Sequence, residues 1–135
     1  MFSRKIWNLQ LWKNLTNLTK LVLFKNKISK IEGIKELSKL EEVNLIFNDL
    51  DRVPVFPSAI KTLSICFNPN LKIESGDLNN LQKLEILRLK ANNIKSLPNG
   101  FLTHMEHLKE IKLGYWFDCR KKYKSLIIYL NFRQQ

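Results

Sequence analysis

The sequence of 135 residues has few of the residues that mark disulfide-stabilised domains or phosphate-binding loops. It contains two cysteines, Cys66 and Cys119, and four glycines. Two cysteines are too few for a disulfide framework, so we expect a reducing compartment. The glycines form no Gly-rich phosphate loop. The sequence also lacks paired carboxylates or a Ser/His/Asp set at a spacing that would indicate an active site. We therefore expect no enzyme activity and no cofactor.

Long apolar runs are also absent. No run approaches the roughly 20 residues that a membrane-spanning helix needs. The first residues, "MFSRKIWNLQLWKNL", are interrupted by Asn, Gln and Lys and lack the apolar stretch of a signal peptide. These features predict no membrane insertion and a cytoplasmic location, with export as an effector as the alternative.

Acidic residues are scarce at the start of the chain. Residues 1–31 contain seven Lys or Arg residues, and the first acid is Glu32. The whole chain has 23 Lys and Arg against 12 Asp and Glu, a formal net charge of +11. Such a surface attracts anionic partners. It predicts a protein partner with an acidic surface, and the alternative is nucleic acid or another polyanion.

One spacing recurs along most of the chain. In "LTKLVLFKNKI" (residues 18–28), four apolar residues and one asparagine follow one another at offsets of three, two, three and two. A plain strand would repeat every second residue and a helix every three to four. The template returns from residues 40, 60 and 84, and in part from 108, where Trp116 replaces the asparagine, so the periods are 22, 20, 24 and 24. The asparagines are Asn26, Asn48, Asn68 and Asn92.

This template resembles that of the leucine-rich repeat family, L-x-x-L-x-L-x-x-N-x-L with periods of 20–29 residues. The resemblance covers about residues 18–117, as five repeats that start near 18, 40, 60, 84 and 108. It implies an α/β solenoid shaped as a short horseshoe arc. A parallel sheet would form the concave face, and short helical, 3₁₀ or extended segments the convex face. It also implies a scaffold for protein–protein interaction.

The template has a physical explanation. The middle leucines, such as Leu21 and Leu23, alternate along a short strand and point inward. The asparagine stands where the chain bends away, and its amide can pair with backbone groups that the turn leaves open. We therefore predict a ladder of asparagines beside the sheet. One repeat cannot bury its own leucines, but several stacked repeats can.

The connecting segments are expected to differ. The three-residue apolar spacing in "ISKIEGIKELSKL" (residues 28–40) predicts a short helix or 3₁₀ turn. The two prolines of "VPVFPSAI" (residues 53–60) predict an extended return. In "LPNGFLTHMEHL" (residues 97–108), Phe101 is predicted to be a buried aromatic residue on the convex side.

A solenoid needs caps at both ends. For the C-terminal cap, residues 118–135, we predict a helix that is N-capped by Asp118. Its apolar stripe would be Cys119, Tyr123, Leu126, Ile127 and Leu130. The β-forming residues 127–129 leave an extended last part as the alternative.

The N-terminal cap segment, residues 1–17, has two interpretations. Ile6, Leu9, Leu11 and Asn14 fit the repeat template, whereas Trp7, Leu11, Leu15 and Leu18 fall on one face of a helix. In either case we expect Trp7 or Trp12 to pack against the core.

Residues that alternate with the inward leucines point out of the sheet on the concave face. Contiguous exposed apolar surface with aromatic residues usually marks a contact site. We therefore predict that a protein partner binds there, with cations at one end of the apolar patch. The predicted site consists of Val22, Phe24, Ile46, Phe47, Phe67, Arg88, Lys90, Lys112 and Tyr115.

Several details of this face stay open at the level of sequence. Phe47 and Phe67 either face solvent or tuck into the turn before the asparagine, whereas Phe24 and Ile46 are more clearly outward. Cys66, on the same face, is interpreted as a passive thiol because no histidine or cation is forced close to it. Self-association through the apolar patch, giving a homo-oligomer, is an alternative to a different partner.

The two histidines, His104 and His107, could form a metal pair at i, i+3. A complete ligand set is absent, however, so solvated surface histidines are the better interpretation and no metal is expected. The stretch "RKKYK" (residues 120–124) could be a nucleic-acid patch or a nuclear-import signal. A solvated face of the capping helix explains it equally well.

Overall fold

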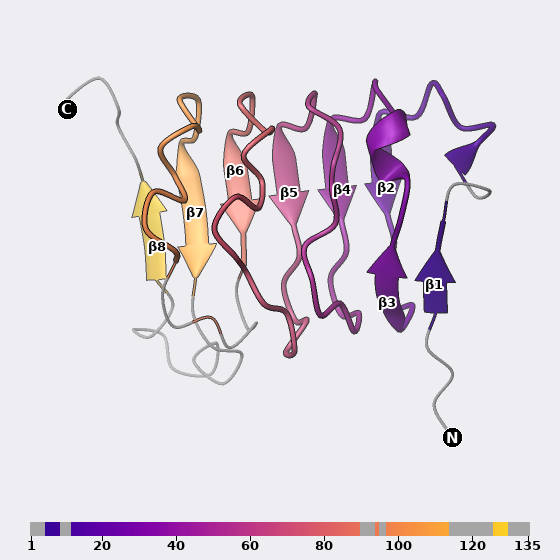
Figure 1. Ribbon diagram of the computed structural model, residues 1–135, viewed down its shortest axis with the longest axis horizontal. Helices are drawn as coiled ribbons and strands as arrows, with labels where there is room; N and C mark the ends of the chain where they lie inside the picture. Colours follow the sequence, from indigo (N-terminus) through magenta and orange to yellow (C-terminus); the bar gives the residue numbers. More distant parts are fainter. Residues whose placement is uncertain (1–4, 9–11, 90–93, 95–96, 114–125, 130–135) are drawn as a thin grey trace.

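The computed structural model describes residues 5–8, 12–89, 94, 97–113 and 126–129. Its main feature is a six-stranded sheet with connecting arcs that cross one side of it (Figure 1). In spatial order the strands are β2 (Lys20–Val22), β4 (Glu42–Asn44), β5 (Thr62–Ser64), β6 (Ile86–Arg88), β7 (Glu110–Leu113) and β8 (Leu126–Tyr129). The pairs from β2 to β7 are parallel, so the predicted α/β solenoid with a parallel sheet is confirmed.

The strand register follows the leucine template. Equivalent template positions face one another across every parallel pair of the six-stranded sheet. The central inward row is Leu21, Val43, Leu63, Leu87 and Ile111. A shift by one residue would turn this whole row outward, so burial of the row specifies the register.

The core lies between the sheet and the arcs. The inward strand residues and the leucines or isoleucines that open the later repeats are buried, and the arcs add Leu37, Phe56, Leu81 and Phe101. Phe101 is 3% exposed, as the pattern predicts for a convex-side aromatic residue. Each repeat thus buries its apolar side against its neighbours, as a stacked architecture requires.

The first two arcs differ in the way that their sequences predict. The first contains η1 (Ile34–Glu36), a 3₁₀ helix, preceded by the short strand β3 (Ile28–Ile31). The second, residues 53–60, contains neither helix nor strand, and its two prolines are buried. Proline lacks an N–H group and restricts its predecessor, so an extended return follows from the sequence.

The N-terminal segment forms an arrangement that neither interpretation predicted. β1 (Lys5–Trp7) pairs in parallel with β3, forming a two-stranded sheet apart from the main one (Figure 1). Trp12 is almost fully buried and donates its indole N–H to the Glu32 carbonyl over 2.9 Å. The Trp7 and Trp12 rings lie 5.6 Å apart, and Trp7 packs partly against the core. The helical interpretation is therefore wrong for Trp7, which belongs to a strand.

Over residues 126–129 the predicted C-terminal helix is wrong, and the extended alternative is confirmed. These residues form β8, which is antiparallel to β7 with Ile111 opposite Ile128. Without β8, β7 would present a row of unpaired backbone groups at the sheet edge. Pairing with that edge, together with the β-preference of residues 127–129, outweighs the helical spacing. The proposed helix start at residues 118–119 lies outside the described residues.

The predicted asparagine ladder is present. The Asn48 side chain is buried and donates to the carbonyls of Leu23 and Leu45 over 2.7 and 3.0 Å. Its oxygen accepts from the backbone N–H groups of Asn26 and Ile28 over 3.0 and 3.1 Å. One side chain thus satisfies backbone groups of its own repeat and of the preceding one.

The next repeat reproduces this geometry. The Asn68 amide donates to Leu45 and Ile65 carbonyls, both over 3.0 Å, and its oxygen accepts from the Leu50 N–H over 3.0 Å. Asn26, in the first repeat, donates to Phe24 in its own turn and is half-buried. Asn92 lies outside the described residues. The buried asparagines of the ladder, Asn48 and Asn68, therefore join adjacent repeats.

We predict that Asn48→Ala lowers the free energy of unfolding by roughly 1–3 kcal/mol, because buried backbone groups of two repeats lose their partner. Asn26→Ala is the matched control, and it should cost less because Asn26 is more exposed and its side chain, within the described residues, joins no preceding segment. Urea unfolding of both variants measures the difference. Equal costs for the two substitutions would contradict the inter-repeat role of the ladder.

Candidate functional site

Three aromatic residues mark the concave face, the sheet surface that points away from the core. Phe24 and Phe47 are 53% and 45% exposed, and Phe67 is half-buried. Phe24 and Phe47 lie edge to face with ring centroids 5.5 Å apart, and Phe47 stacks on Phe67 at 4.3 Å. Both arrangements are favourable for aromatic pairs. We call Phe24, Phe47 and Phe67 the aromatic row.

The aliphatic members of the predicted site flank the aromatic row. Val22 is 50% exposed, whereas Ile46 is half-buried. Phe24 is outward, as the alternation predicts, but Phe47 is more exposed than Ile46. The alternative in which Phe47 tucks into the turn is therefore wrong, because its ring lies between two other rings on the surface.

The backbone before the asparagines is left-handed in three consecutive repeats. Lys25, Phe47 and Phe67 have φ values of 58°, 58° and 59°. This region is uncommon for residues other than glycine, asparagine and aspartate, and it is unfavourable for bulky side chains. The same turn is thus made three times, twice with a phenylalanine that local preferences disfavour.

In the third repeat, two small residues of the outward row are almost fully covered by their neighbours. Ser64 and Cys66 are only 3% and 7% exposed, although both are on the outward row. The expectation that Cys66 faces outward into solvent is therefore wrong. A small side chain is easily covered where adjacent positions carry larger ones, such as Ile46 and Arg88. Burial makes Cys66 less accessible as a reactive thiol.

The cations of the predicted site are in different environments. Lys112 pairs with Glu110 over 3.5 Å, and Lys20 of the same face pairs with Glu42 over 3.2 Å. Arg88 is half-buried and donates to the Ser64 hydroxyl over 3.3 Å. Lys90 and Tyr115 lie outside the described residues. The structure thus brings the aromatic residues and Arg88 together over adjacent strands, while Lys112 is paired with a carboxylate of its own strand.

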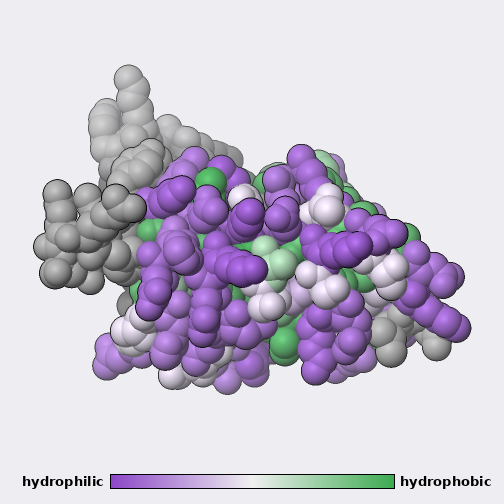
Figure 2. All heavy atoms as spheres, turned by 90° about the horizontal axis from the view of Figure 1, so that it is seen from above, coloured by the Kyte–Doolittle hydropathy of each residue, from purple (hydrophilic) through white to green (hydrophobic). Residues whose placement is uncertain are grey.

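The edge of the solenoid where the parallel strands begin has alternating charges. Seen from above, this edge is mostly hydrophilic (Figure 2). Lys61 pairs with Glu41 of the preceding repeat, and Lys109 pairs with Glu85, both over 3.4 Å. Because acid and base alternate from repeat to repeat, this edge is no continuous cationic surface.

A groove of about 570 Å³ lies on the other side of the molecule, between β3 and the second arc. Its lining includes the exposed Ile6 and Val55 as well as Lys30 and Arg52. No local sequence pattern indicates this groove, because it depends on the pairing of β1 with β3.

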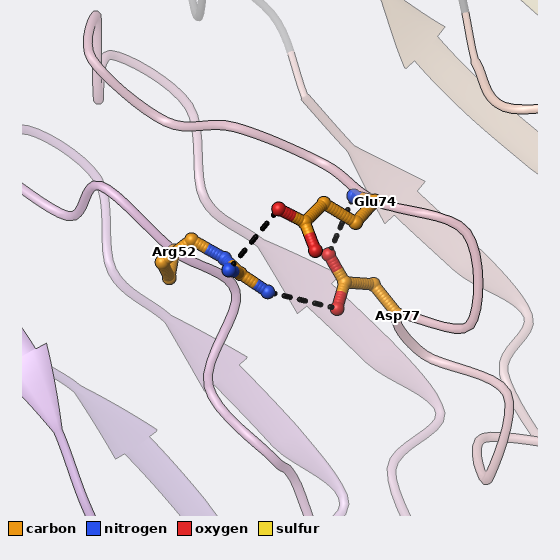
Figure 3. Close-up of polar contacts among 3 residues, drawn as sticks. All are labelled: Arg52, Glu74 and Asp77. Atoms are coloured by element: carbon orange, nitrogen blue, oxygen red, sulfur yellow. Dashed lines mark hydrogen bonds and ion pairs between the residues drawn. The ribbon is translucent and has the colours of Figure 1, made fainter.

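Beside this groove, Arg52 joins two neighbouring arcs. Its guanidinium contacts the carboxylates of Glu74 and Asp77 over 3.2 and 3.9 Å (Figure 3). Asp77 also accepts from the Glu74 N–H over 2.8 Å, closing the turn around Gly76, whose φ is +95°. Both carboxylates of this cluster therefore have structural partners, and we interpret the cluster as a clamp between arcs.

The other candidate sites remain surface features in the described part of the chain. His104 and His107 are both exposed. No group of three or more His, Cys, Asp or Glu residues among the described positions could hold a metal ion. Within the same residues, no helix has the length and apolar character needed to cross a membrane.

Comparison with known proteins decides the family. No family model matches the chain. It is 33% identical over 94 residues to the human "Leucine-rich repeats and immunoglobulin-like domains protein 1", with 66% of this chain and 9% of that protein covered. The repeat template, the parallel solenoid and this likeness agree. The chain belongs to the leucine-rich repeat family.

Two further relatives are similar over more of this leucine-rich repeat chain. The Arabidopsis thaliana "Protein phosphatase 1 regulatory inhibitor subunit PPP1R7 homolog" is 30% identical over 106 residues, covering 76% of this chain and 31% of the relative. Bovine osteomodulin is 31% identical over 106 residues, covering 75% and 25% respectively. The chain thus spans less than a third of the length of each of these three relatives.

We predict that Arg52→Met changes the free energy of unfolding by no more than about 1 kcal/mol, because its ion pairs are exposed to solvent. Asp77→Ala should cost roughly 1–2 kcal/mol, because it also removes the acceptor that closes a turn. Thermal unfolding of the two variants tests this ranking. A larger loss for Arg52→Met would mean that the ion pairs dominate the clamp.

Proposed function

We propose that this leucine-rich repeat chain is a non-catalytic protein-binding module whose concave face holds a partner with an acidic surface. The observation that carries the proposal is the aromatic row, three rings in contact over three adjacent repeats with two of them about half exposed. Aromatic residues supply much of the energy at protein interfaces, and exposed apolar clusters of this kind usually mark contact sites.

The names of the relatives are compatible with this class of function. One of them is named as a regulatory inhibitor subunit of a protein phosphatase, a role exerted on another protein. The low number of cysteines favours a reducing compartment, so we propose a cytoplasmic location for the binding event.

The distribution of charge supports a protein partner over nucleic acid. Nucleic-acid binding relies on many cations that neutralise phosphates. On and beside the described concave face, Lys20, Lys61, Lys109 and Lys112 each contact a carboxylate within 3.5 Å. The formal charge of +11 is therefore partly compensated where the apolar surface lies.

We predict that Phe24→Ser weakens binding of a partner captured from native lysate roughly thirtyfold, since a truncated aromatic anchor costs about 2 kcal/mol. The loss should appear mainly as faster dissociation. The melting temperature should hardly change, because the ring lies outside the core. Surface plasmon resonance with the purified partner measures both rates.

Val55→Ser is the matched control, because Val55 is also an exposed apolar residue but lies on the second arc, away from the sheet. It should leave partner binding unchanged. Lys25→Glu should slow association, and more strongly at low salt. If charge reversal dominates at both salt concentrations while Phe24→Ser has no effect, the site binds a polyanion and the proposal is wrong.

A further inference from the structure

The aromatic row runs across the repeats at the edge where the strands end. Phe24 follows the end of β2 by two residues, and Phe47 and Phe67 follow β4 and β5 by three. The row is continuous, because each ring contacts the next. A partner that covers all three rings must therefore lie across the strand ends rather than along one strand.

The backbone indicates that these rings have a role besides folding. Phe47 and Phe67 occupy left-handed positions that glycine or asparagine would occupy with less strain. Phe47 is 45% exposed and is not part of the buried core cluster, so the fold gains little from its ring. Strained residues of this kind are often found at binding sites, where the geometry serves a contact.

Two cations without a described carboxylate partner stand at the two ends of the row. Lys25 belongs to the first repeat, is exposed and precedes Phe47 in the left-handed row. Arg88 belongs to the fourth repeat, and its guanidinium reaches back to Ser64 of the third. Among the described residues, neither cation has a carboxylate within 4 Å, whereas Lys20 and Lys112 of the same face do.

The separation of these cations limits the length of the ligand. Lys25 and Arg88 belong to repeats that are three strand spacings apart, but the Arg88 guanidinium lies over the third repeat. The two charged groups are therefore two to three spacings apart, roughly 10–14 Å, which about three to five extended residues can span at roughly 3.3 Å each. A segment of this length could place carboxylates near both cations and an apolar side chain on the rings. Resting on the proposed function, we infer that the aromatic row binds a short extended protein segment whose bulky apolar residues are flanked by carboxylates about three to five residues apart.

The ring geometry favours such a segment over single-stranded nucleic acid. Bases bind by stacking on open aromatic faces, with phosphates neutralised along the strand. Phe47 and Phe67 stack on each other with an interplanar angle of 15°, so their facing surfaces are already occupied. The exposed ring edges and the two cations instead match an apolar side chain between two acids.

The test is selection of a random nonapeptide display library on the immobilised full chain. The inference expects enriched peptides with one or two large apolar residues between Asp or Glu residues at the stated spacing. Enrichment of basic peptides, enrichment without this pattern, or no enrichment would overturn it. Tight binding of a ten-residue oligothymidylate, together with no binding of any peptide, would also overturn the inference.

Phe47→Asn separates a binding role from a structural one, because asparagine tolerates the left-handed backbone. The variant should bind the best selected peptide at least tenfold more weakly, with a melting temperature equal to or above that of the wild type. Unchanged affinity, or a clearly lowered melting temperature, would overturn the inference.

Lys25→Asn is the matched charge-removing variant at the equivalent backbone position. Because Lys25 is exposed, this substitution should not unfold the protein. It should weaken binding severalfold and reduce the salt dependence. The loss should vanish for a peptide whose terminal acid on that side is replaced by Ser. An equal loss for both peptides would show that Lys25 does not contact the acid.

These outcomes separate this inference from the broader proposal. If Phe24→Ser reduces capture of the protein partner while Phe47→Asn does not, and no patterned peptide is selected, the concave face binds a partner but not through the segment inferred here. If neither variant changes capture, the proposed function itself is wrong.

Discussion

The hydrogen bonds of the buried asparagines are the interaction on which the remaining structure depends. Asn48 and Asn68 each satisfy backbone groups of two successive repeats, so the turn at the end of one strand is tied to the turn before it. An unpaired buried backbone group would be costly, which is why a side chain with both a donor and an acceptor occupies this position. These bonds therefore tie each turn to the one before it and support the register that burial of the inward row specifies.

Because the repeats are held in register, every template position becomes a row that crosses the molecule. The inward rows form the core, and the row at the edge where the strands begin carries charges that alternate between neighbours, as in Glu41 and Lys61 or Glu85 and Lys109. The row before the asparagines contains Phe47 and Phe67 in left-handed conformation. An aromatic surface of three contacting rings is thus a product of alignment between repeats, and no single repeat could form it.

The parts predicted correctly are those governed by local or strictly periodic constraints. The strands, their register, η1 and the burial of Phe101 follow from a spacing that can bury apolar residues in only one way. The errors concern segments whose partners are distant in sequence. β8 forms because β7 offers an open edge, and β1 forms because β3 also offers an open edge. A helical spacing in these segments could not reveal either edge.

In the candidate site, too, some features follow from the sequence pattern and others depend on contacts between repeats. Alternation along the strands identified Val22 and Phe24 as outward, but it also placed Cys66 outward, and neighbouring side chains bury it. By itself the sequence determined the family, the sheet and the ladder, because each repeat carries the same hydrogen-bonding and burial requirement. Only the tertiary structure decided which outward residues stay exposed and which rings touch. Those properties depend on the sizes and turn conformations of residues about 20 positions apart, which are brought side by side when the repeats stack.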